Sequence, residues 1–148
     1  MEIKIKKMRP GAVIPQRATP GSAAVDLCAV LDGDGKLTLP PMGRALVPTG
    51  IAIELESADY VALVFARSGL AVKHGLALSN SVGVIDSDYR GEISVGLVNL
   101  SNTAYTITNG ERIAQLAVMP VALPQIVEVT QLSDTARGAG GFGSTGRQ

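Results

Sequence analysis

Turn-forming residues divide this chain into short segments, and their spacing limits the folds that it can adopt. Gly, Pro, Asn and Asp cluster about every ten residues, in RPGAVIP, TPGS, DGDG, LPPMG, VPTG, TNGE and LPQ. The segments between the clusters alternate apolar and polar side chains or are apolar throughout: EIKIKKM, GIAIELE, YVALVFA, GEISVGLVNL, AYTIT, RIAQLAVM and QIVEVTQL. Alternation with a period of two is typical of a strand with one buried face. The sequence therefore predicts an all-β protein, with a sandwich, a jelly roll or a barrel as the alternatives.

One segment, ARSGLAVKHG (66–75), instead predicts a helix of about two turns. Ser68 is the expected N-cap, because its hydroxyl can accept a hydrogen bond from a free N–H group of the first turn. Gly75 is the expected stop, because glycine readily adopts the left-handed conformation that ends a helix. His74, the only histidine, is expected to interact with the last helical carbonyls.

The composition fits one folded domain. The chain has 148 residues, 46% of them hydrophobic, and its 13 basic residues equal its 13 acidic residues in number. This balance argues against nucleic-acid and membrane-surface partners, which select for a basic excess. Aromatic residues make up only 3%, so we expect an aliphatic core. We expect a β domain over residues 1–136, followed by a flexible Gly-rich segment, 137–148, that orders only on a partner or ligand.

Cysteine content and the N-terminus predict a cytoplasmic location. The single cysteine, Cys28, cannot form an intramolecular disulfide, and its apolar surroundings predict a plain packing role. The first residues alternate charge with isoleucine, unlike a signal peptide. No apolar run reaches the roughly 18 residues that cross a bilayer.

The side chains at hand limit the possible chemistry. One histidine leaves no plausible Ser/His/Asp triad and too few ligands for a zinc hydrolase. Three polar segments remain: ARSGLA (66–71), SNSVGVIDSDYRGE (79–92) and RGAGGFGSTG (137–146). The first is suited to bind a phosphate, the second places carboxylates beside an asparagine and a tyrosine, and the third offers backbone N–H groups, an arginine and a phenylalanine. Each also has a plain structural interpretation, as a capped helix, a polar hairpin tip and an unstructured tail.

Together with SAAVDLCA (22–29) and GERIAQL (110–116), these segments resemble the five motifs of the trimeric dUTPase family, in order and over nearly the whole chain. One difference lies in AAVDL, where the family more often has a glycine before a larger residue and the aspartate. The resemblance implies a jelly-roll-like β protein that assembles as a homotrimer with active sites between subunits. It also implies Mg²⁺-dependent hydrolysis of dUTP to dUMP and pyrophosphate, which keeps uracil out of DNA and supplies dUMP for dTMP synthesis.

The resemblance also implies roles for single residues. Asp86 would be the general base that holds a water in line with the α-phosphorus. Asp26 would hold the water shell of Mg²⁺, the expected cofactor. Tyr89 would pack against the sugar and reject a 2′-hydroxyl. The other expected substrate contacts are Arg67, Ser68, Gly69 and Gln115 for the phosphates, Asn80, Gly83, Val84, Ile85 and Ser94 for uracil, and Arg137, Phe142, Gly143 and Ser144 in a closing tail.

Some alternatives stay open. Gln115 has a plain cross-strand hydrogen bond as its other interpretation. Asp88, Arg90 and Glu92 are expected to support the hairpin rather than to touch the nucleotide. A dCTP deaminase shares the fold but uses a different acid/base arrangement, and the full GVIDSDYRGE favours the pyrophosphatase. A dUTPase-like binding protein would lack motif residues, and none is missing here.

Overall fold

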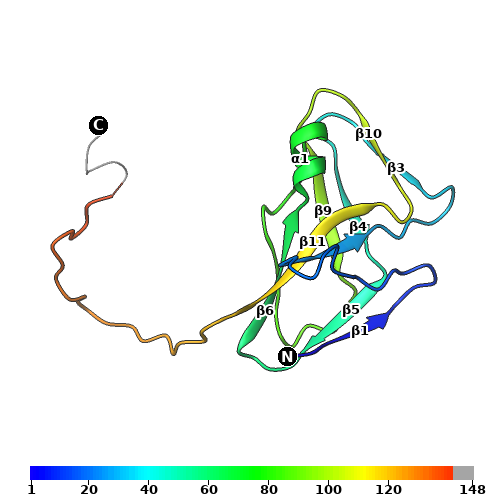
Figure 1. The fold of residues 1–148 in the computed structure, drawn as a ribbon. Coiled ribbons are helices and arrows are strands. Elements are labelled where there is room, and N and C mark those ends of the chain that lie inside the picture. Colours follow the sequence, from blue (N-terminus) through cyan, green and yellow to red (C-terminus); the bar gives the residue numbers. More distant parts are fainter. Residues whose placement is uncertain (142–148) are drawn as a thin grey trace.

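Strands make up most of the body of the molecule (Figure 1). The structure, a computed structural model, describes residues 1–141 of the chain. Its strands are β1 (Ile3–Lys7), β2 (Val25–Cys28), β3 (Lys36–Leu39), β4 (Arg44–Pro48), β5 (Ile51–Leu55), β6 (Tyr60–Ala66), β7 (Leu76–Leu78), β8 (Gly83–Ile85), β9 (Ser94–Asn99), β10 (Tyr105–Thr108) and β11 (Arg112–Pro120). In the described residues one helix, α1 (Ser68–His74), lies between β6 and β7. The prediction of an all-β protein with one short helix is confirmed.

The strands pair antiparallel in four sheets. The largest has the order β2-β11-β6-β8, a second has the order β4-β9-β7, and β1-β5 and β3-β10 are pairs. The long strand β11 lies between β2 and β6, so that Gln115 is opposite both Asp26 and Phe65. The largest sheet therefore gathers parts of four of the motif segments, although they are far apart in the sequence.

The core is aliphatic, as the low aromatic content predicts. Its largest fully buried apolar side chains are Leu27, Val47, Ile51, Leu76, Ile93, Leu97, Ile107 and Ile113. Two polar side chains, Thr49 and Asn99, are buried with them. The Thr49 hydroxyl donates to the carbonyl of Ile93 (2.6 Å). The Asn99 amide donates to the carbonyls of Leu39 (2.9 Å) and Thr103 (2.8 Å). Because these groups have partners, their burial carries little penalty.

Helix α1 begins one residue earlier than the sequence predicts. Its N-cap is Arg67, with an extended backbone (φ −87°, ψ 130°) and no side-chain cap hydrogen bond, so the predicted Ser68 cap is wrong. The Arg67 side chain is instead bonded to Asp26. The predicted stop is confirmed, because Gly75 has a φ of 68° and its N–H donates back into the last turn. Among the described residues no helix is long and apolar enough to cross a membrane.

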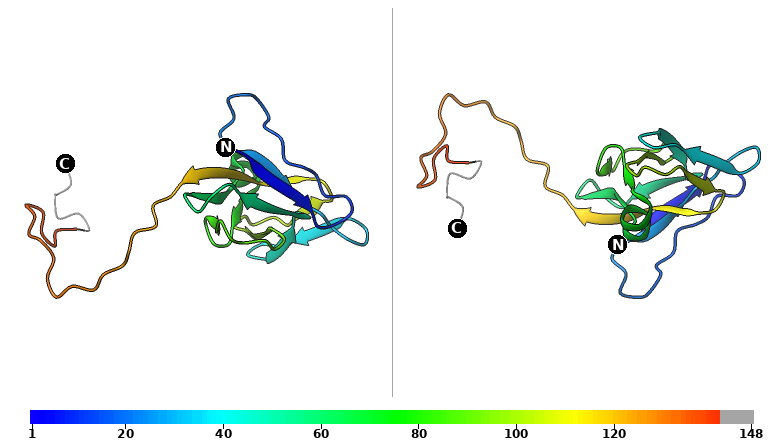
Figure 2. Two further views of the ribbon diagram at one scale, coloured as in Figure 1. Left: turned by 90° about the horizontal axis from the view of Figure 1, so that it is seen from below. Right: turned by 90° about the horizontal axis from the view of Figure 1, so that it is seen from above.

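Beyond β11 the chain runs away from the body as an extended segment, the C-terminal arm (residues 121–141; Figure 2). Several of its apolar side chains are more than half exposed: Leu123, Ile126, Val127, Val129 and Leu132. The predicted strand over QIVEVTQL (125–132) is therefore wrong for the single chain. A strand needs a neighbouring backbone with which to exchange hydrogen bonds, and within residues 1–141 none pairs with this segment.

Candidate active site

The first part of the site lies under the 79–92 segment. Strand β8 pairs with β6, with Gly83 opposite Val64. The two backbones approach closely, because a Cβ on Gly83 would lie 3.1 Å from the Cβ of Val64. The Nδ2 atom of Asn80 lies 3.8 Å from the same point. The Asn80 amide is therefore next to the backbone of β8.

After β8 the chain turns back toward β9 and encloses the hairpin hollow, of about 310 Å³. Its lining residues are Leu46, Val84, Ile85, Asp86, Tyr89, Glu92, Ile93 and Ser94. Apolar walls with a few polar groups suit a flat organic ring. Of the residues that the sequence predicts for uracil, sugar and general base, the structure brings Val84, Ile85, Asp86, Tyr89 and Ser94 to this hollow.

Tyr89 is fixed by its own turn. Its hydroxyl donates to the carbonyl of Glu92 (3.1 Å), and a side chain on Gly91 would overlap its ring. The Glu92 carboxylate accepts hydrogen bonds from the N–H of Gly50 (2.9 Å) and from Nε of Arg9 (2.9 Å). The hairpin is thus tied to the body of the protein through Glu92, while Tyr89 stays 45% exposed at the hollow.

A second hollow, the arginine pocket, lies where β2, β11 and the start of α1 meet. It has a volume of about 370 Å³ and is lined by Ala18, Ser22, Ala23, Ala24, Asp26, Arg67, Ser68, Gly69, Arg112 and Gln115. The Nε of Arg67 donates to Asp26 Oδ1 (2.8 Å), and Nη1 of Arg112 donates to Asp26 Oδ2 (3.0 Å). Two cations thus surround one carboxylate, so this pocket suits an anionic ligand such as a phosphate.

The arginine pocket also holds the predicted metal residue. Both Asp26 oxygens already accept a hydrogen bond from an arginine, and in the described residues no three His, Cys, Asp or Glu side chains group closely enough to hold a metal. A carboxylate has about four acceptor positions, so Asp26 can still accept from water. The residues therefore fit a hydrated Mg²⁺ that Asp26 contacts through the bound waters. They do not fit a metal ion coordinated by several protein side chains.

Two side chains near Asp26, those of Gln115 and Cys28, have plain structural roles. Gln115 donates its amide to the carbonyl of Ala66 (2.9 Å), which is the cross-strand bond of its alternative interpretation, and it also lines the pocket. Burial, followed by the nearby charge of Asp26, raises the pKa of the Cys28 thiol. Cys28 is therefore held as a thiol, in keeping with a packing role.

The two hollows share no lining residue among the described residues. Gly83 and Asn80 line neither of them, although both lie beside β8. Arg137 lies in the C-terminal arm, where its Nε donates to the carbonyl of Gly140 (2.8 Å). Phe142, Gly143 and Ser144 lie outside the described residues.

Sequence reasoning missed Arg112 and Gly91. Arg112 lies in the segment GERIAQL (110–116). The direction of its side chain depends on an irregular register in β11 that no residue pattern reveals. Gly91 lies two positions after Tyr89 in the 79–92 segment, and the sequence alone assigns it no role. An aromatic residue two positions before a glycine in a tight loop is a signal that could have found it.

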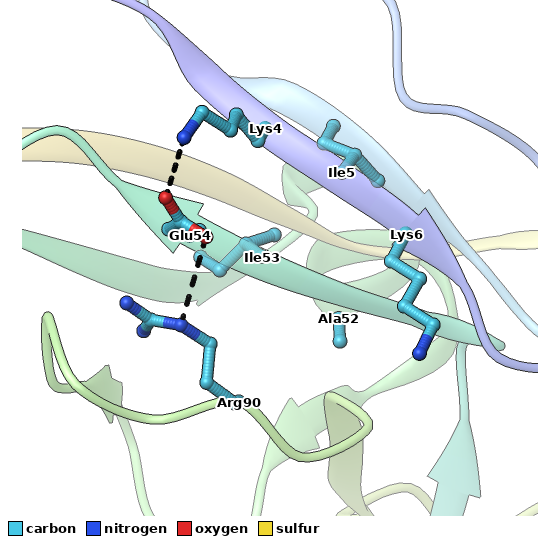
Figure 3. Close-up of a pocket in the computed structure, with 7 residues that line it drawn as sticks. All are labelled: Lys4, Ile5, Lys6, Ala52, Ile53, Glu54 and Arg90. Atoms are coloured by element: carbon cyan, nitrogen blue, oxygen red, sulfur yellow. Dashed lines mark hydrogen bonds and ion pairs between the residues drawn. The ribbon is translucent and has the colours of Figure 1, made fainter.

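A third hollow lies apart from both, over β1 and β5 (Figure 3). Lys4 Nζ lies 2.6 Å from Glu54 Oε1, and Arg90 Nε lies 3.9 Å from Glu54 Oε2. The bond to Glu54 raises the pKa of Lys4, and the same bond lowers the pKa of Glu54. These exposed charges satisfy one another, and such surface pairs add little to stability.

The geometry of the two hollows indicates a protein that binds a phosphorylated ring compound. The chain carries an arginine-lined pocket and, separately, a hollow with apolar walls and a carboxylate, and the two together suit a ligand that carries both phosphates and a ring. The sequence model of the dUTPase family matches residues 11–146, and the chain belongs to this family. Family membership is thus confirmed, and with it the predicted class of enzyme, a dUTP diphosphatase.

Relatives from bacteria and phage agree. A deoxyuridine 5'-triphosphate nucleotidohydrolase of Wolinella succinogenes is 49% identical over 147 residues, which cover 99% of this chain and 95% of that protein. One from Desulfitobacterium hafniense is 54% identical over 133 residues, or 90% and 87% of the two chains. The dUTPase of Staphylococcus bacteriophage 80alpha, solved with dUPNHPP, has a TM-score of 0.88 and 26% identity over 99% of each chain. A mutant dUTPase of phage phi11 of S. aureus, which coordinates a structural Mg(II) ion, shares the fold with a TM-score of 0.80 at 21% identity, over 90% of this chain and all of that one.

Proposed function

We propose that this enzyme hydrolyses dUTP to dUMP and pyrophosphate by in-line attack of a water on the α-phosphorus, with Asp86 as the general base. The observation that carries the proposal is the place of Asp86, directly after β8 and at the edge of the hairpin hollow with Tyr89. Asp86 is exposed and forms no ion pair within the described residues, whereas Asp26 is paired with two arginines. A carboxylate without a cation beside it is free to accept the proton of a water.

Asp86 is preferred over Asp88 as the general base because of its position at the hairpin hollow. Asp86 lines the hairpin hollow with Tyr89 and Ser94, and Asp88 does not. Asp88 lines only a neighbouring depression, formed with Tyr60 and the first residues of the C-terminal arm, which Asp86 also borders. Phosphoryl transfer depends mainly on positioning and charge stabilisation, so one correctly placed carboxylate is enough.

The proposed uracil site is the free edge of strand β8. Strand β8 is the last strand of the largest sheet and pairs with β6 on one side only. The backbone groups of Gly83, Val84 and Ile85 that point away from β6 can therefore pair with the edge of a base. The neighbouring Asn80 amide offers a further donor and acceptor. Cytosine reverses part of the uracil pattern and would leave buried groups unpaired.

The other predicted contacts complete the substrate site. Tyr89 packs against the deoxyribose, with Ser94 on the opposite wall of the hollow. The phosphates are received in the arginine pocket by Arg67, Ser68, Gly69 and Gln115. When bound there, Mg²⁺ supplies charge neutralisation of the phosphate oxygens, and Asp26 accepts hydrogen bonds from its water shell. Arg137, with Phe142, Gly143 and Ser144 of the tail, closes over the substrate.

We propose a homotrimer with a jelly-roll-like subunit as the functional assembly. The C-terminal arm supports this proposal. Its apolar side chains are exposed in the described part of one chain, and packing against a second subunit would bury them. Shared active sites would bring the two hollows and a tail together from different subunits. The proposed role is to keep uracil out of DNA and to supply dUMP for dTMP synthesis. The cytoplasmic location stays a prediction from the sequence.

The test is a product analysis with separate nucleotides. The enzyme with Mg²⁺ is incubated with dUTP, dCTP, dTTP and UTP, and the products are separated by ion-exchange chromatography. We expect dUMP and pyrophosphate from dUTP alone. Conversion of dCTP to dUTP would establish the deaminase instead, and binding of dUTP without any product would establish a binding protein.

A further inference from the structure

Arg112 is aimed by an irregularity in β11. From Ala114 to Leu116 this strand pairs regularly with β2, with Gln115 opposite Asp26. Between Arg112 and Ala114 the register shifts. Arg112 lies opposite Cys28, and β11 carries one extra residue relative to β2. Alternate residues of a strand share a face, so Cys28 and Asp26 lie on the same face of β2. The bulge therefore turns Arg112 to the face of Asp26 and Gln115.

The burial of the intervening residues agrees with this bulge. Ile113 and Ala114 are consecutive, yet both are fully buried, at 1% and 0% exposure. The register shift lies between Arg112 and Ala114, so Ile113 is the extra residue and is taken up inside the protein. Without it, Arg112 would point away from the arginine pocket that it now lines.

Arg112 and Arg67 share one carboxylate and also contact each other. Each donates to a different oxygen of Asp26, at 3.0 and 2.8 Å, and Arg67 Nη1 donates to the backbone carbonyl of Arg112 (3.0 Å). The Arg112 side chain is 56% exposed, against 26% for Arg67 and 21% for Asp26. Arg112 therefore closes the solvent side of the cluster, and Arg67 lies deeper.

The charges of this cluster do not cancel. Two guanidinium groups and one carboxylate leave an excess of one positive charge, and arginine stays charged at any ordinary pH. If Asp26 faced Arg67 alone, the pair would be neutral and would attract a polyphosphate weakly. Arg112 thus offsets the charge of Asp26 while Asp26 holds Arg67 in place.

We propose that Arg112 is a positioning residue of the phosphate site, which neutralises Asp26 and so leaves the charge of Arg67 available to the triphosphate. This inference rests on the proposed function, since it requires the phosphates of dUTP to enter the arginine pocket. The β-bulge in β11 is the structural feature that makes it possible. Arg112 acts through Asp26 and Arg67 and need not touch the substrate.

The test measures binding of dUPNHPP to the full-length protein by isothermal titration calorimetry, with EDTA present so that no metal contributes. We expect Arg112→Gln to weaken binding about tenfold, because one charge-assisted contact of the cluster is lost. Arg112→Lys keeps the charge and should stay within about threefold of the wild type. The control is Arg44→Gln, an exposed arginine on β4 in another sheet, which should bind as the wild type does.

A second comparison separates charge from folding. The double variant Asp26→Asn with Arg112→Gln restores the excess positive charge on Arg67, and it should bind dUPNHPP more tightly than Arg112→Gln alone. A misfolded single variant would not recover in this way. Binding of dUMP, which lacks the outer phosphates, should change less than twofold in Arg112→Gln.

Several results would overturn the inference. These are an unchanged affinity in Arg112→Gln, an equal loss for dUMP and dUPNHPP, no rescue by lysine, and no recovery in the double variant. A wild-type protein that binds dUPNHPP tightly while Arg112→Gln binds equally well contradicts only the role of Arg112. A wild-type protein that does not bind dUPNHPP contradicts the proposed function itself.

Discussion

The ring of Tyr89 occupies the space that a side chain on Gly91 would need, and its hydroxyl donates to the carbonyl of Glu92 (3.1 Å). Tyr89 is therefore folded back over its own turn. Because the same ring lines the hairpin hollow, the absence of a side chain at position 91 sets the shape of that hollow.

Gly91→Ala should loosen the choice between dUTP and UTP. The added methyl group displaces the Tyr89 ring, which opens room for a 2′-hydroxyl, and the ratio of kcat/KM for dUTP over UTP should fall about tenfold. Steady-state kinetics with both nucleotides measures this ratio. The control is Gly21→Ala, where a Cβ meets nothing within 4 Å. An unchanged ratio in Gly91→Ala would show that Tyr89 does not read the sugar.

Asp86→Asn should remove the general base without removing the substrate site. The rate of the chemical step should fall by about 10²–10⁴, while binding of dUPNHPP stays within a few-fold of the wild type. Single-turnover assays at saturating enzyme isolate that step. Asp88→Asn is the matched control, because Asp88 does not line the hairpin hollow, and it should keep most of the activity. The reverse pattern would assign the base to Asp88.

Local patterns predicted the strands β1, β5, β6, β9, β10 and β11, the helix and its Gly75 stop, because each depends on neighbours in the sequence, whereas the shorter strands β2, β3, β4, β7 and β8 were not predicted. Alternating apolar residues and regular turn signals reflect the pleat and the turn geometry directly. Of the residues that the motif segments single out, Tyr89 and Ser94 line one hollow and Arg67 and Ser68 line the other, whereas Asn80 and Gly83 line neither.

The errors arose where contacts between distant segments decide the outcome. Arg67 occupies the N-cap position of α1 while its side chain is bonded to Asp26, 41 positions earlier, and no local signal reports that bond. The QIVEVTQL segment has a strand pattern but no partner strand in the described part of the chain. Arg112 is aimed by a bulge, which is a property of strand pairing and not of residue type.

Tyr105 should make the stability fall at high pH. Burial, followed by the hydrogen bond that its hydroxyl donates to Glu111, raises the pKa of Tyr105 from 10.0 to about 12. The unfolded chain then loses this proton first as the pH rises, so the contribution is intact below pH 10 and is lost as the pH passes 12. The free energy of unfolding, measured in urea at a series of pH values, should decline more steeply in the wild type than in Tyr105→Phe.

Tyr60→Phe is the control for that comparison, because in the described residues the Tyr60 hydroxyl has no hydrogen bond to a carboxylate. It should keep the wild-type slope between pH 10 and 12. Parallel slopes for the wild type and Tyr105→Phe would contradict the assigned cause.

Deletion of residues 137–148 should lower turnover about 10²-fold if, as we propose, the tail closes the site over the substrate. Thermal stability should change little, since the described hydrogen bonds of residues 137–141 stay within the C-terminal arm, to Thr135, Arg137 and Gly140. Steady-state kinetics and differential scanning calorimetry give the two quantities. Deletion of residues 147–148 alone is the control and should leave both unchanged. A truncated enzyme with normal turnover would show that the tail has no catalytic part.

Hydrolysis of dUTP in ¹⁸O-labelled water tests the central claim most directly. Attack of water on the α-phosphorus must place the labelled oxygen in dUMP and none in pyrophosphate, which mass spectrometry of the separated products can read. We predict one ¹⁸O atom per dUMP formed and unlabelled pyrophosphate. Label in the pyrophosphate, or the absence of hydrolysis, would contradict the account.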